Sequence, residues 1–219
     1  MADHDQRFKQ LLREFFAEFL RLFFPEVADR LDLSAVEWLD QELFLDPPQG
    51  AKRRLDLVAK VPARDPIAAA RAGEPAYRLA LLHVEAETDA TVPEMRERML
   101  EYYWYLRRKH RLPVLPVVLY LRVGLDGIGV DTYVEEVWGA PVLAFTYRYI
   151  GLPGLDGEAY KDSANLLGVA LSALMKIRSE RRVEAAAEAL DRVVQSTESP
   201  WRKFLLADCI QAYAPLEPA

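Results

Sequence analysis

The sequence has little cysteine, no long apolar run and fewer basic than acidic residues. Its only cysteine, Cys209, excludes an intramolecular disulfide bond and a metal site built from several cysteines. No apolar run reaches the roughly 18–20 residues that a bilayer-spanning helix needs. The polar start MADHDQRFKQ does not resemble a secretory signal. These absences favour a cytoplasmic protein that has no contact with a membrane.

The charge balance bears on the class of partner. The chain has 28 Lys and Arg residues against 34 Asp and Glu residues, which gives a formal net charge of -6. This balance argues against nucleic-acid binding through overall charge, but it does not exclude binding through a local basic groove. Hydrophobic residues make up 51% of the 219 residues, enough for a sizeable core in one globular domain with an appended tail.

The spacing of apolar residues predicts an ordered series of helices and strands. We predict helices over 5–24, 94–110, 158–178, 180–194 and 200–213, and strands over 36–45, 54–61, 78–87, 112–122 and 145–150. Thr91 and Glu94 fit a capping box at the start of the helix over 94–110. This order predicts an α/β fold with a mixed sheet. We expect residues 1–178 to form the domain and residues 179–219 a helical C-terminal tail.

Two carboxylates end the apolar strand over 78–87. Glu85 and Glu87 in the segment HVEAET are two residues apart, so they share one face of the strand with His83. Like charges side by side cost free energy, which a divalent cation would offset. Asp56 interrupts the apolar strand RLDLVAKV. If the two strands are neighbours, Asp56 and Glu85 converge on one face of the sheet.

Each of these residues also has a purely structural explanation. A strand that ends in solvent commonly carries glutamate, and Asp56 could be an edge-strand charge that discourages aggregation. His83 fits a packed or hydrogen-bonded histidine better than a metal ligand. Spacing alone therefore leaves a metal site and an ordinary strand end as alternatives.

Five segments occur in an order that is similar to the PD-(D/E)XK nuclease superfamily. They are DQRFKQLL, RLDLVAKV, LLHVEAET, RERMLEYYWYL and LPVVLYL, and the resemblance covers roughly residues 4–175. Within the superfamily, the chain resembles the Rpn-type recombination-promoting nucleases and transposase-like proteins of bacteria. The resemblance implies a restriction-endonuclease-like fold, in which a mixed β-sheet is flanked by helices. It also implies a Mg²⁺-dependent endodeoxyribonuclease, with Mn²⁺ as a substitute, that hydrolyses phosphodiester bonds in DNA and is linked to recombination or mobile elements.

The resemblance assigns roles by position. Asp56 and Glu85 would be catalytic acids that bind the metal, and the backbone carbonyl of Ala86 would supply a further oxygen. Glu14, on the polar side of the first helix, occupies the place of an acid that joins the site in many members, with a solvated helix face as the alternative. Glu87 stands at the catalytic position where the pattern has lysine. This glutamate departs from the pattern, because it would place a negative charge beside the phosphate of the DNA substrate.

The class of function stays open between three alternatives. Four arginines are candidates to hold DNA in a nuclease: Arg96, Arg98, Arg107 and Arg108. The Glu87 departure and the acidic balance support a catalytically inactive nuclease-fold module that binds nucleic acid or another partner. A third alternative is a different metal hydrolase that uses His83 with the two glutamates. Self-association as a homodimer also stays open.

Overall fold

The computed structural model describes residues 2–39, 43–46, 51–54, 57–65, 79–87 and 90–213. Its centre is a six-stranded sheet with the strand order β1-β4-β5-β6-β8-β7. The strands of this sheet are β1 (Glu37–Leu39), β4 (Leu57–Pro62), β5 (Leu79–Glu87), β6 (Val114–Tyr120), β7 (Gly127–Val137) and β8 (Ala140–Gly151). Two further strands, β2 (Leu43–Asp46) and β3 (Ala51–Arg54), pair with each other in a separate small sheet.

The large sheet is mixed, as the sequence predicts. β4 lies antiparallel between β1 and β5, and β7 is antiparallel to β8. β5 and β6 are parallel, and so are β6 and β8. The carboxyl ends of β5, β6 and β8 therefore lie at the same edge of the sheet. The structure confirms an α/β class with a mixed sheet between helices.

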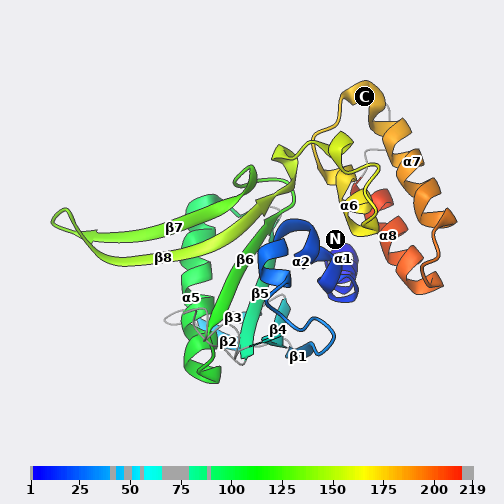
Figure 1. The fold of residues 1–219 in the computed structure, drawn as a ribbon. Helices are drawn as coiled ribbons and strands as arrows, with labels where there is room; N and C mark the ends of the chain where they lie inside the picture. Colours follow the sequence, from blue (N-terminus) through cyan, green and yellow to red (C-terminus); the bar gives the residue numbers. More distant parts are fainter. Residues whose placement is uncertain are drawn as a thin grey trace.

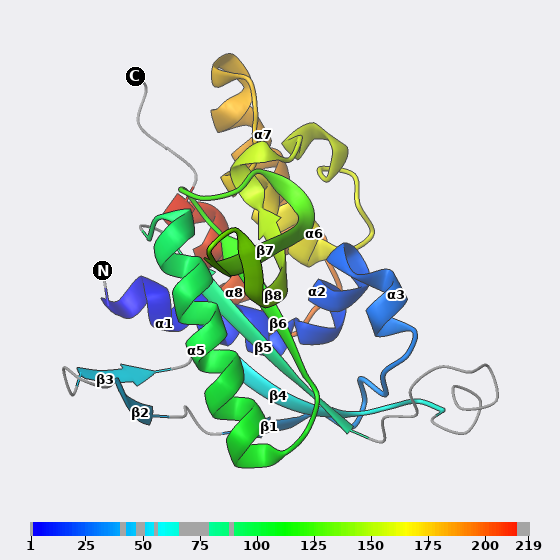
Figure 2. The same ribbon diagram turned by 90° about the vertical axis from the view of Figure 1, so that its left-hand side faces the viewer.

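Helices cover both faces of the sheet. Among the described helices, α5 (Val92–His110) covers one face, and α1 (Ala2–Glu14), α2 (Phe16–Phe23) and α3 (Pro25–Ala28) lie on the other (Figures 1 and 2). Helices α6 (Leu166–Leu171), α7 (Arg182–Gln195) and α8 (Pro200–Tyr213) pack beside α1 and α2 (Figure 1). None of the helices in the described ranges is both long and apolar enough to cross a bilayer.

The alternation of β5 divides the interior into two cores. Leu82 and Val84 belong to the larger core on the α1 side, whereas Leu81 belongs to the smaller core under α5. The helical spacing of Met95, Met99, Tyr102 and Leu106 predicts that they form the inner side of α5, and all four are buried. The same spacing predicts that the N-terminal helices bury Phe8, Leu12, Phe15 and Phe19, which are each at most 3% exposed.

The capping box at the start of α5 is also confirmed. The backbone N–H of Thr91 donates to Glu94 Oε2 at 2.9 Å, and the Thr91 hydroxyl donates to the same oxygen at 2.8 Å. At the other end, Arg111 adopts a left-handed conformation with φ of 55°. Such a residue commonly terminates a helix.

The prediction of one continuous helix over 158–178 is wrong. The segment contains the short 3-10 helices η2 (Gly157–Ala159) and η3 (Ser172–Leu174), with α6 between them. Asn165 has extended backbone angles, and its side chain accepts a hydrogen bond from the backbone N–H of Leu167 at 3.1 Å. An N-cap residue is not itself helical, so no helix can run through Asn165. Two more 3-10 helices are η1 (Leu152–Gly154) and η4 (Ser179–Arg181).

Two further boundaries differ from the sequence predictions. The predicted helix over 5–24 is interrupted at Phe15, whose φ of -107° and ψ of 28° separate α1 from α2. The predicted strand over 36–45 contains both β1 and the start of β2. The sequence analysis also missed β7, which forms a long hairpin with β8 that projects from the body (Figure 1).

The C-terminal helices share the main core. α7 and α8 match the two short helices predicted over 180–194 and 200–213. Leu205 and Ile210 of α8 lie in the same buried cluster as Phe8 of α1. Arg7 of α1 also forms an ion pair with Asp208 of α8 at 2.6 Å. The predicted tail is therefore helical and is packed against the N-terminal helix.

Candidate functional site

The strands that carry the predicted metal site are neighbours. Leu57 of β4 pairs with Val84 of β5, and Val58 pairs with His83. Val58 lies in the core under α5, whereas Leu57 lies in the core on the other face. Asp56, the first of the predicted catalytic acids, lies outside the described residues. The adjacency of the two strands is thus confirmed, and the position of the Asp56 carboxylate stays a prediction.

Glu85 is a buried carboxylate that contacts the histidine predicted behind it. Glu85 Oε1 lies 2.8 Å from His83 Nε2, and the two residues are 4% and 0% exposed. The His83 ring also meets the Tyr102 ring of α5 edge to face, with 5.2 Å between the ring centroids. His83 is therefore a packed, hydrogen-bonded histidine that orients the Glu85 carboxylate.

Glu87 contacts a residue just before α5 and one in its second turn. Its Oε2 lies 2.6 Å from Arg98 Nη1, and its Oε1 accepts the backbone N–H of Ala90 at 2.9 Å. Burial alone would lower the pKa of Arg98, but the hydrogen bond and the negative charge of Glu87 outweigh burial and raise it. The charge of Glu85 acts in the same direction. The carboxylate at the lysine position of the nuclease pattern is thus neutralised by a guanidinium.

A second polar cluster, which the sequence analysis missed, lies on the same face of the sheet. Arg96 of α5 binds both carboxylate oxygens of Asp131 in β7 at 2.8 Å, and the Tyr147 hydroxyl donates to Asp131 at 2.6 Å. The Tyr120 hydroxyl lies 3.4 Å from that of Tyr147. Burial raises the pKa of Tyr147, and the hydrogen bonds to Asp131 and Tyr120 raise it further. The only signal in the sequence was Asp131, an acid in the middle of the alternating strand GIGVDTYVEEV.

The structure does not bring Glu14 to the face that carries Glu85. The Glu14 carboxylate lies 3.7 Å from the guanidinium of Arg202 in α8. Helix α1 packs on the face of the sheet opposite α5 (Figure 1), so the sheet separates Glu14 from the side chain of Glu85. Ala86, the predicted source of a backbone ligand, pairs with Leu119 in the middle of the sheet.

The four candidate DNA-binding arginines fall into two pairs. Arg96 and Arg98 form ion pairs with acids of the protein. Arg107 and Arg108 are exposed in the last turn of α5, and neither has an ion-pair partner in the part of the chain that the structure describes. The helical rise places Arg107 about 14 Å along α5 from Arg98, toward the opposite edge of the sheet.

The described side chains alone do not make up a metal centre. Within the described ranges, no group of three or more His, Cys, Asp and Glu residues has the arrangement to hold a metal ion. Glu87 is engaged by Arg98, which leaves Glu85 as the described carboxylate best suited to a cation. A hydrated Mg²⁺ ion needs one or two carboxylates. The further acid that the sequence offers is Asp56, which directly precedes Leu57.

Sequence and structure comparisons give no assignment of family. No model of a known protein family, no curated protein and no solved structure matches the chain.

Proposed function

We propose that the chain is a metal-dependent endonuclease of the PD-(D/E)XK type that hydrolyses phosphodiester bonds in DNA. Asp56 and Glu85 would hold Mg²⁺, with Mn²⁺ as a substitute, and the carbonyl of Ala86 would be a further ligand. When bound, such an ion supplies Lewis acidity that activates water and stabilises charge on the phosphate. The adjacency of β4 and β5, together with the buried Glu85 near the end of β5, supports this assignment.

The ion pair between Glu87 and Arg98 is the observation that carries the proposal. A glutamate at the lysine position would otherwise repel the phosphate of the substrate. Here the 2.6 Å contact with Arg98 offsets that charge. A guanidinium offers several N–H donors that match phosphate oxygens. Arg98 would therefore bring N–H donors near the position where the pattern has lysine, from the helix instead of from the strand, while its charge is balanced by Glu87.

A metal ligand also has to be held in one orientation. The contact with His83 would do this for the Glu85 carboxylate. Because His83 is completely buried and packs on Tyr102, its ring is fixed by the core under α5. The 2.8 Å contact then fixes one oxygen of Glu85. Residues that orient a ligand in this way improve the geometry and affinity of metal sites.

One observation favours a second candidate, a catalytically inactive module that keeps the fold. Glu85 contacts His83, and Glu87 contacts Arg98. Both described carboxylates at the end of β5 thus have partners within the protein. In this alternative, the network serves to hold α5 on the sheet, and any nucleic acid would be bound without cleavage.

Cleavage of supercoiled plasmid separates the two candidates. The wild-type protein should nick the plasmid with Mg²⁺ or Mn²⁺ and not with EDTA. Asp56→Ala and Glu85→Gln should abolish cleavage, and Arg98→Ala should reduce it strongly. Glu14→Gln is the matched control, because it removes a carboxylate from the other face of the sheet and should leave cleavage unchanged. If neither the wild type nor Glu87→Lys cleaves with either metal, the inactive module is the better assignment.

A further inference from the structure

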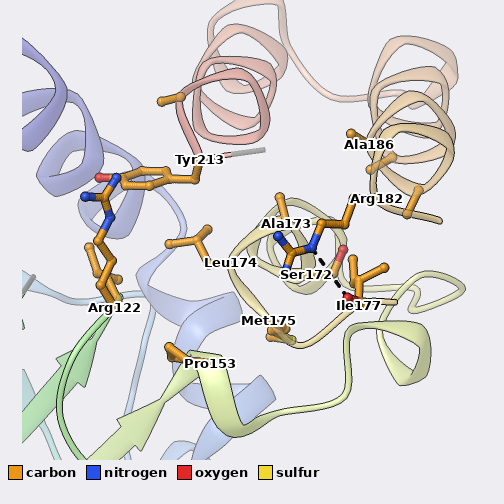
Figure 3. A pocket seen from close by; sticks show the side chains of 14 residues that line it. Arg122, Pro153, Ser172, Ala173, Leu174, Met175, Ile177, Arg182, Ala186 and Tyr213 are labelled. Carbon is orange, nitrogen blue, oxygen red and sulfur yellow. Dashed lines mark hydrogen bonds between the residues drawn. The ribbon is translucent and has the colours of Figure 1, made fainter. Parts of the chain in front are cut away.

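A pocket of about 420 Å³ opens beside the carboxyl ends of β6 and β8. Leu121 and Arg122, which follow β6, and Pro153, which follows β8, form one wall. The segment around η3, the first half of α7 and the end of α8 form the rest (Figure 3). The backbone N–H of Leu121 donates to the carbonyl of Glu87 at 2.8 Å. The pocket is thus joined to the end of β5, although its lining contains none of the residues assigned to the nuclease site.

The charge of the pocket is opposite to that of the protein. Two arginines line it, Arg122 and Arg182, and no lining residue is acidic, although the chain carries a net charge of -6. Neither arginine has a carboxylate partner among the described residues. Arg182 donates only a long hydrogen bond of 3.5 Å, to the carbonyl of Ile177. Both guanidinium groups therefore retain N–H donors for an anion.

The arginines border an apolar surface. Figure 3 shows Arg122 and Tyr213 on one side of the pocket and Arg182 on the other, with Leu174 and Met175 between them. Five of the remaining lining residues are alanines, and their short side chains leave the space open. A ligand that fills this space would place an apolar body on these side chains and a charged group at its rim.

We propose that this pocket binds a small organic anion, whose carboxylate or phosphate group is held by one of the two arginines, Arg122 on one side or Arg182 on the other, and whose apolar body fills the alanine-lined interior. Ion-paired hydrogen bonds from guanidinium to carboxylate or phosphate are among the strongest in proteins. The volume lies within the range of roughly 300–1,000 Å³ that is usual for small-molecule sites. In open α/β sheets, ligands bind outside the carboxyl ends of the strands, which is where this pocket lies. The proposal is independent of any nuclease activity.

Calorimetric titration of the full chain tests the site with two probes that share one ring system. They are 1-naphthyl phosphate and 1-naphthoate, and the tighter binder identifies the preferred anionic group. Inorganic phosphate lacks the apolar body and 1-naphthol lacks the charge, so both should bind at least about tenfold more weakly. Equal binding of 1-naphthol would show that the arginines play no part and would overturn the proposal.

Substitutions then locate the binding. Of Arg122→Ala and Arg182→Ala, the variant that removes the arginine holding the anionic group should raise the Kd of the better probe at least about tenfold, and the other should change it less. Arg178→Ala removes an exposed arginine outside the lining and should leave the Kd unchanged. Ala185→Phe should block the pocket without a change of charge, and thermal melting followed by circular dichroism confirms that each variant is folded. The proposal fails if neither probe binds the wild type. It also fails if the double variant, with both Arg122→Ala and Arg182→Ala, binds the better probe as tightly as the wild type does.

Discussion

Arg98 and Glu87 join α5 to the last residue of β5 through a contact of 2.6 Å. The Glu87 side chain is 12% exposed and that of Arg98 is 29% exposed, so water screens this pair less than it screens a surface ion pair. Glu87 also accepts a hydrogen bond from the backbone of Ala90. One carboxylate therefore links the end of the strand, Ala90 and the helix.

We expect Arg98→Ala to lower the free energy of unfolding by about 1–3 kcal/mol, because it leaves Glu87 half-buried without its cation. Glu87→Gln should also lower the free energy of unfolding, since the amide oxygen can accept only one of the two hydrogen bonds and the NH2 group then faces the other donor. Urea denaturation of the two single variants and the double variant measures the coupling between the side chains. Arg108→Ala, an exposed change in the same helix, should stay within about 0.5 kcal/mol of the wild type. Additive single effects would show that the ion pair contributes nothing to stability.

Phe15 should be a strong determinant of stability. Its side chain is 1% exposed in the larger core, and the Arg202 guanidinium lies 3.9 Å from the centroid of its ring. Phe15→Ala should therefore lower the free energy of unfolding by about 3–5 kcal/mol. Phe204→Ala removes a ring that is 48% exposed and serves as the matched control in chemical denaturation. Equal losses for the two variants would contradict the assignment of Phe15 to the core.

Asp131 should make stability depend on acid pH. Burial tends to raise the pKa of Asp131, but the hydrogen bonds from Arg96 and Tyr147 outweigh burial and lower it. A folded-state pKa below the unfolded value means that this carboxylate stabilises the fold above an unfolded pKa of about 4, and that the contribution is lost as the pH falls through the folded value. Asp131→Asn should thus destabilise the protein at neutral pH and reduce the further loss in acid.

Denaturation at several pH values checks the role of Asp131. Asp162→Asn, which removes an exposed carboxylate, should retain the acid dependence of the wild type. A pH profile of Asp131→Asn that runs parallel to that of the wild type would assign the acid sensitivity to other groups.

Divalent cations should raise the melting temperature if Asp56 and Glu85 form a metal site. A ligand that binds only the folded state stabilises it by mass action, so the rise should grow with the concentration of Mg²⁺ or Mn²⁺. Asp56→Ala should show a smaller rise. Glu87→Gln should keep most of the rise, because Arg98 already engages that carboxylate. An equal rise in Asp56→Ala and the wild type would remove Asp56 from the metal site.

The sequence predicted those features that depend on local spacing. The start of α5 at Thr91 follows from one capping motif, and its buried side follows from the helical repeat of Met95, Met99 and Tyr102. The period of two in β5 placed Glu85 and Glu87 on one face, where the structure has them.

Pairings between distant segments could not be predicted in this way. Arg96 and Asp131 are 35 positions apart, and nothing local indicates that β7 returns to cover the start of α5. Arg96 and Arg98 resemble solvent-facing arginines in the sequence, because their acid partners lie in other elements. The position of Glu14 relative to Glu85 could not be predicted for the same reason, since it depends on how α1 packs with α8.

The two faces of β5 limit how this protein can change in evolution. Leu82 and Val84 belong to one core, and the alternate residues His83 and Glu85 belong to the polar network on the other face. A one-residue insertion or deletion within the strand would exchange the two sets. It would place carboxylates in the apolar core and take Glu87 away from Arg98. β5 can therefore vary only by substitution, and changes of length have to be confined to the segments that connect the strands.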